Sequence, residues 1–105
     1  MLIVQTPIFT KRVLDILTDD EYRGLQLYPT KRPDAGDLLS GTRGLRKLRW
    51  SASGRGKRGG ARVVYYWIKS NETLLMLFIF KKNERSDLTK DQLKLLQTLA
   101  GRELR

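Results

Sequence analysis

The longest apolar run of the chain, from Leu74 to Phe80, limits what this protein can fold into. It lies inside a β-type segment from Thr73 to Lys81, and its side chains are apolar on both sides of the strand. Such a strand must be covered on both faces, so we expect it at the centre of a sheet. The run is too short to span a membrane, and 105 residues have room for one domain, residues 1–105.

Two further β-type segments, Leu45 to Trp50 and Arg62 to Lys69, come before the central strand. A Gly-rich basic loop separates the two, and a turn at Ser70 to Glu72 leads into the central strand. Because these strands follow one another through short connections, we expect them to be antiparallel. In the first of them, alternation places Lys47 and Arg49 on one face.

A short β-type segment and two helices are predicted before these strands. The β-type segment is Leu2 to Gln5, and a helix from Pro7 to about Thr18 follows from apolar residues at helical spacing. Thr18 and Glu21 form a capping-box pattern. This pattern predicts a second helix from Asp19 to Tyr28.

An irregular segment from Pro29 to Gly44 and a last helix complete the predicted elements. The last helix has Thr89 as its N-cap and a buried stripe formed by Leu93, Leu96 and Leu99 or Ala100. The order is strand, helix, helix, strand, strand, strand, helix. This order indicates an α+β fold, in which helices pack on one antiparallel sheet.

Positive charge is concentrated in the middle of the chain, and the formal net charge is +10. Between Asp37 and Glu72 there is no acid, whereas nine basic residues occur there: Arg43, Arg46, Lys47, Arg49, Arg55, Lys57, Arg58, Arg62 and Lys69. A field of one sign suits a polyanion, and nucleic acid is the commonest polyanion for a small protein.

Cysteine and histidine are both absent from the sequence. Disulfides and thiolate metal sites are therefore excluded, and the usual general base and zinc ligand are missing. We expect no metal and no other cofactor. The N-terminus has no signal-peptide pattern, so we expect a cytoplasmic protein without a membrane partner.

Three segments carry a family resemblance: GLRKLRW, GKRGGARVVYYW and LFIFKKNERSDLT. With the strand and helices around them, they resemble the RelE/ParE toxin superfamily, and most of all the RelE-like HigB branch of type II toxin–antitoxin systems. The resemblance implies a small microbial RNase fold and a ribosome-dependent endoribonuclease that cuts mRNA. It also implies the ribosome, mRNA and a cognate antitoxin as partners, the antitoxin being HigA-like with a helix-turn-helix part.

RNA can be cleaved by its own 2′-OH group, which attacks the adjacent phosphate. The reaction needs a base, positive charge for the transition state and an acid for the leaving oxygen. A lysine among other cations has a lowered pKa and can act as the base, while arginines stay charged and bind phosphate. The resemblance implies Lys47 as base, Arg49 and Arg62 as transition-state stabilisers and Lys82 as acid or stabiliser.

Other basic residues are predicted to contact RNA or the ribosome. Arg55, Lys57 and Arg58 lie in the Gly-rich loop, and the same role is predicted for Arg43, Arg46, Lys81 and Arg85. Arg85 has the alternative of pairing with Glu84 or Asp87.

The chain departs from the best-known RelE members at two positions. Asn83 stands in place of an arginine, and Thr89 stands in place of a tyrosine that stacks on a base. Base stacking is then left to Trp50 or Tyr65, or is missing. Two other functions stay open: a ParE-like inhibitor of DNA gyrase, and an RNA-binding module without catalysis.

Overall fold

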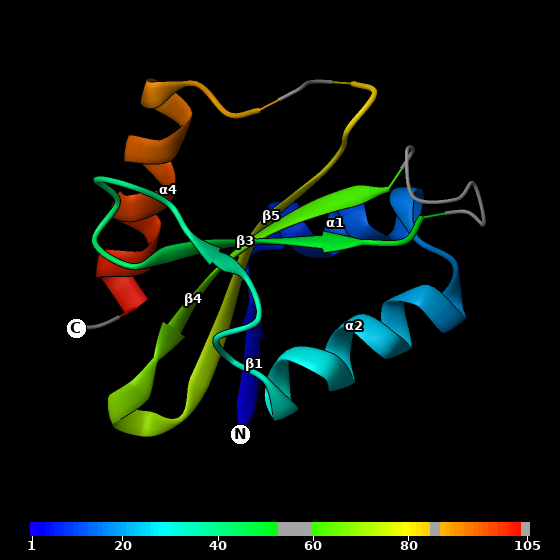
Figure 1. Ribbon diagram of the computed structural model, residues 1–105, viewed down its shortest axis with the longest axis horizontal. Coiled ribbons are helices and arrows are strands. Elements are labelled where there is room, and N and C mark those ends of the chain that lie inside the picture. Colours follow the sequence, from blue (N-terminus) through cyan, green and yellow to red (C-terminus); the bar gives the residue numbers. More distant parts are fainter. Residues whose placement is uncertain (53–59, 85–86, 104–105) are drawn as a thin grey trace.

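The computed structural model describes residues 1–52, 60–84 and 87–103. Their main feature is a five-stranded sheet with helices on both faces (Figure 1). The elements are β1 (Leu2–Gln5), α1 (Pro7–Ile16), α2 (Asp19–Lys31), β2 (Asp37–Leu38), β3 (Leu45–Trp50), β4 (Ala61–Ile68), η1 (Lys69–Asn71), β5 (Thr73–Lys81) and α4 (Lys90–Glu103).

The strand order β1-β5-β4-β3-β2 confirms the α+β class and the antiparallel pairing of β3, β4 and β5. It also confirms the interior position of β5, which lies between β1 and β4. One expectation was wrong, because β1 pairs with β5 in parallel and the sheet is mixed. Leu2 pairs with Thr73, a residue so distant in sequence that no short connection fixes the direction of the pair.

The helices begin where the capping residues predict, but they end differently. Thr18 and Glu21 form a complete capping box at the start of α2, and Thr6 caps α1. α1 ends at Ile16, while α2 continues past Tyr28 to Lys31, with Pro29 inside its last turns. The irregular segment before β3 contains the two-residue strand β2, which is too short to show a periodic pattern.

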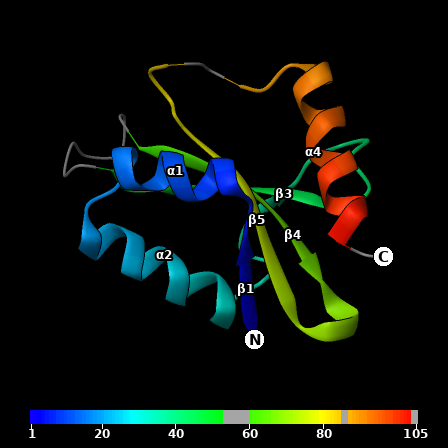
Figure 2. The same cartoon turned by 180° about the vertical axis from the view of Figure 1, so that it is seen from behind.

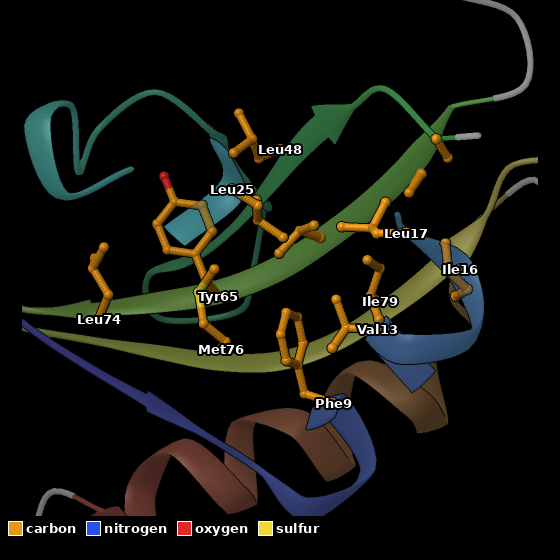
Figure 3. Close-up of a cluster of buried hydrophobic side chains, with 13 residues drawn as sticks. Phe9, Val13, Ile16, Leu17, Leu25, Leu48, Tyr65, Leu74, Met76 and Ile79 are labelled. Atoms are coloured by element: carbon orange, nitrogen blue, oxygen red, sulfur yellow. The ribbon is translucent and has the colours of Figure 1, made fainter. Parts of the chain in front are cut away.

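The two faces of the sheet carry separate cores. α1 and α2 cover one face, here called the α1–α2 face, where Phe9, Val13 and Leu25 pack on Tyr65 and Met76 (Figure 3). α4 lies on the opposite face, here called the α4 face (Figure 2). There Leu96 and Ala100 pack on strand residues such as Leu45 and Val64. Because both cores share β4 and β5, the two central strands are buried on both sides.

None of the helices in residues 1–52, 60–84 and 87–103 is long and apolar enough to cross a membrane.

Candidate nucleic-acid interface

Strands β3 and β4 bring three predicted site residues to the α4 face. In the antiparallel register Arg49 pairs with Arg62, and Lys47 pairs with Val64. Directly paired residues share a face, and Val64 belongs to the α4 core. Lys47, Arg49 and Arg62 therefore point to the same side of the sheet, as the two-residue alternation predicts.

Arg62 is the most buried cation of this group, with 7% of its surface exposed. Its Nη1 donates to the carbonyl of Ala61 at 3.3 Å, and no carboxylate pairs with it within the described ranges. Burial, and second the like charge of Arg49, lower the pKa of the Arg62 guanidinium. A buried charge is costly without a counter-charge, so the surroundings of Arg62 favour an anion.

A hollow opens beside Arg62 at the end of the two strands. Its volume is about 230 Å³, and its described lining is Arg49, Trp50, Ser51, Gly60 and Arg62. A Cβ on Gly60 would lie 2.7 Å from the carbonyl oxygen of Trp50, so only glycine lets the strands approach this closely here. The hollow is large enough for a phosphate group with its neighbouring sugar atoms.

Lys82 lies at the same end of the sheet as the hollow. Its backbone N–H donates to the carbonyl of Gly60 at 3.1 Å, and the residue is exposed. The backbone of Lys82 therefore lies next to Gly60, which lines the hollow together with Arg62.

Lys47 forms an ion pair that was not expected from the sequence. Its Nζ lies 3.2 Å from Oδ1 of Asp87, in the segment before α4. Burial raises the pKa of Asp87, but the hydrogen bond from Leu88 N–H and the contact with Lys47 outweigh it and leave that pKa below its ordinary value. The sequence argument for Lys47 as base named the cations around it, and the structure adds this carboxylate to its surroundings.

Two predicted contact residues lie on the other face of the sheet. Arg46 pairs with Tyr65 of the α1–α2 core, and its Nη1 donates to the carbonyls of Asp34 and Gly36 at 3.2 and 2.8 Å. Lys81 pairs with Ala61, which belongs to the same core. The structure does not bring these two side chains to the α4 face.

Of the remaining predicted contact residues, one lies far from the hollow and the others lie outside the described residues. Arg43 is exposed in the turn before β3, with φ of 61°, at the opposite end of the strand from Arg49. Arg55, Lys57, Arg58 and Arg85 lie outside the described residues. Of the two acids named as partners for Arg85, Glu84 pairs with Arg12, and Asp87 pairs with Lys47.

The two aromatic residues suggested for base stacking differ in access. Tyr65 is fully buried, so the suggestion was wrong for this residue. Trp50 is partly exposed and lines the hollow, while its Nε1 donates to the carbonyl of Glu21 and its ring lies 5.7 Å from that of Tyr28. Thr89 caps α4, as predicted, because its hydroxyl accepts the N–H of Gln92.

Asp87 is the site residue that sequence reasoning missed. Lys47 and Asp87 are 40 positions apart, and no periodic pattern links a strand with a loop at that separation. The acid-free stretch also directed attention to cations, whereas Asp87 lies outside that stretch. Within the described residues, no three acidic side chains gather as metal ligands would.

Comparison with known proteins places the chain in a family. A family model described as the RelE toxin of the RelE/RelB toxin–antitoxin system matches residues 36–105, which include the site strands and α4. A mutant of the E. coli toxin RelE, solved in the free state, has a similar fold with a TM-score of 0.59. The two sequences are 17% identical over 81% of this chain and 86% of that one. The chain belongs to the RelE toxin family of toxin–antitoxin systems.

Proposed function

We propose that this chain is the toxin of a type II toxin–antitoxin system and a ribosome-dependent mRNA endoribonuclease of the HigB branch that needs no metal. One observation carries the proposal: buried Arg62 and exposed Arg49 face each other on paired strands beside an open hollow. Two guanidinium groups that repel each other are stabilised together by one bridging anion. A phosphodiester is such an anion.

The proposed reaction needs only the RNA and this face of the sheet. The 2′-oxygen attacks phosphorus and releases its proton to a base, and the bond from phosphorus to the 5′-oxygen breaks. The 5′-oxygen takes a proton from an acid, which leaves a 2′,3′-cyclic phosphate and a 5′-hydroxyl. Arg49 and Arg62 stabilise the charge that develops on the phosphate oxygens.

The two lysines complete the proposed proton transfers. Lys47 shares the face of Arg49 and Arg62 and is proposed as the base, while Lys82, beside Gly60, is proposed as the acid or as a further stabiliser. Positioning the 2′-OH in line with phosphorus is worth up to about 7–11 kcal/mol in the best cases. We assign that positioning to the ribosome, which explains how a protein with few reactive groups cleaves mRNA.

Family membership implies an antitoxin, and the charge of the chain suggests its character. A net charge of +10 favours a partner with an acidic surface. We propose a HigA-like antitoxin with a helix-turn-helix part, and the cytoplasm as the place where toxin, antitoxin and ribosome meet.

A translation extract with a defined mRNA tests the proposed function. We expect the double variant Lys47→Gln with Arg62→Met to reduce cleavage by more than 100-fold, because it removes two site cations. Methionine fills most of the volume of the buried Arg62 side chain. Circular dichroism and thermal melting check that the variant folds.

A charge-matched control separates the site from the general charge of the chain. Arg23→Gln with Lys31→Gln removes two exposed cations from α2 and should leave cleavage within about twofold. Normal cleavage by the site variant would refute the site. Inhibition of DNA supercoiling with intact mRNA would instead support a gyrase inhibitor, and RNA binding without cleavage in any context would support a binding module.

A further inference from the structure

The three cations on the α4 face differ in their partners. Within the described residues Lys47 has a carboxylate partner, Asp87, whereas no carboxylate pairs with Arg49 or Arg62. The Lys47–Asp87 pair joins the middle of β3 to the segment just before α4. Asp87 therefore reaches the α4 face from a segment outside the strands that carry the three cations.

The position of Asp87 is fixed by its surroundings. Oδ1 of Asp87 accepts the N–H of Leu88 at 2.8 Å and faces Lys47 Nζ at 3.2 Å. Two residues after Asp87, Thr89 forms a reciprocal pair of hydrogen bonds with Gln92 at the start of α4. The helix dipole stabilises a negative charge just before the start of a helix. The carboxylate of Asp87 is therefore also stabilised by its place before α4.

Lys47 has a second acid close by, which makes the observed pairing informative. Asp37 of β2 lies directly opposite Lys47 in the strand register, yet the ion pair in the described structure is made with Asp87. The side chain of Asp87 is 62% exposed and that of Lys47 is 24% exposed. A ligand from solvent can thus reach the carboxylate and replace it.

We propose that Asp87 is a positioning residue that acts through Lys47, its carboxylate standing where a phosphate oxygen of the RNA backbone binds. This inference rests on the proposed function. A carboxylate and a phosphodiester both present two anionic oxygens to an ammonium group at hydrogen-bond distance. Asp87 holds the charged Lys47 side chain over the α4 face, and the incoming RNA phosphate displaces the carboxylate. Lys47 acts as the base only after its ammonium group has lost a proton.

The proposal predicts that Asp87 lowers the affinity for RNA. Removing its charge should tighten binding by about two- to fivefold, the range that an exposed ion pair produces. It should also steepen the logarithmic dependence of affinity on salt, because RNA binding then displaces no carboxylate that cations of the solvent must screen. Asn at this position keeps the oxygen that accepts the N–H of Leu88.

Fluorescence anisotropy with a labelled single-stranded 2′-O-methyl oligonucleotide measures this affinity without cleavage, since the attacking hydroxyl is blocked. The test variant is Asp87→Asn, and Asp37→Asn is the matched control, because it removes the same charge beside the same lysine. Both changes are also made with Lys47→Gln. Without Lys47, Asp87→Asn should have no larger effect than Asp37→Asn.

The possible outcomes separate this inference from the proposed function. Tighter binding and a steeper salt slope for Asp87→Asn alone, both lost with Lys47→Gln, would support the inference. Equal effects of the two Asn variants, or weaker binding by Asp87→Asn, would overturn the inference and leave the proposed function standing. A wild-type protein that binds no RNA even at low salt would overturn the inference, whereas the proposed function is overturned by the result of the translation extract.

Discussion

At the scale of single residues, the Tyr65 hydroxyl shows how the sheet is joined to the segment before β2. It donates to the carbonyl of Pro33 at 2.7 Å and accepts the N–H of Gly36 at 2.9 Å. Tyr65→Phe should lower the free energy of unfolding by about 1–3 kcal/mol, since buried backbone groups lose their partner. Urea unfolding at pH 7 measures the loss. Tyr28→Phe, on an exposed side chain, should change it by less than about 0.5 kcal/mol.

The same hydroxyl gives this prediction a pH dependence. Burial raises the pKa of Tyr65 above 10.0, against the opposing effects of the Gly36 hydrogen bond and Arg46. A raised pKa stabilises the folded protein below the unfolded pKa, and this contribution is lost as pH rises above about 10. The difference between wild type and Tyr65→Phe should therefore shrink between pH 9 and 11. A difference that is constant with pH would contradict the burial of this group.

At the scale of elements, the start of α4 depends on Thr89. Its hydroxyl accepts the N–H of Gln92 at 3.1 Å, and its own N–H donates to Gln92 Oε1 at 2.8 Å. Thr89→Ala should cost about 0.5–2 kcal/mol of stability and speed hydrogen exchange in the first turn of α4. Thr98→Ala is the matched control, because this threonine of the same helix is exposed and its hydroxyl only donates back to Lys94. It should be neutral or slightly stabilising, and equal effects of both changes would contradict the capping role.

These elements show which parts of the fold were predictable from the sequence. The Thr89 cap, the antiparallel strands β3 to β5 and the shared face of Lys47 and Arg49 follow from local patterns. The parallel pairing of β1 and the contact between Lys47 and Asp87 join residues far apart in sequence, where no local pattern sets direction or distance. The burial of Tyr65 was also not predictable, because the sequence of a strand rich in aromatic residues does not show which ring faces the core.

At the scale of the whole molecule, the charges that suit the proposed site lower the stability of the fold. The charges of Arg49 and Arg62 repel each other across paired strands, and Arg62 is buried in the sheet. A protein selected for stability alone would not keep two such cations together. Sites that bind charged ligands commonly retain features of this kind at a cost in stability.

The variant Arg49→Gln separates the effect on stability from the effect on RNA binding. Its melting temperature should equal or slightly exceed that of the wild type, because one like charge beside buried Arg62 is gone. Its affinity for single-stranded RNA should fall, and the logarithmic salt dependence should become shallower by about 0.7, the share of one phosphate contact. Arg23→Gln removes the same charge from α2, where Arg23 pairs with Asp20, and should leave RNA affinity nearly unchanged. Scanning calorimetry and anisotropy measure the two quantities. A marked loss of stability in Arg49→Gln, or unchanged RNA binding, would show that Arg49 serves the fold and not the site.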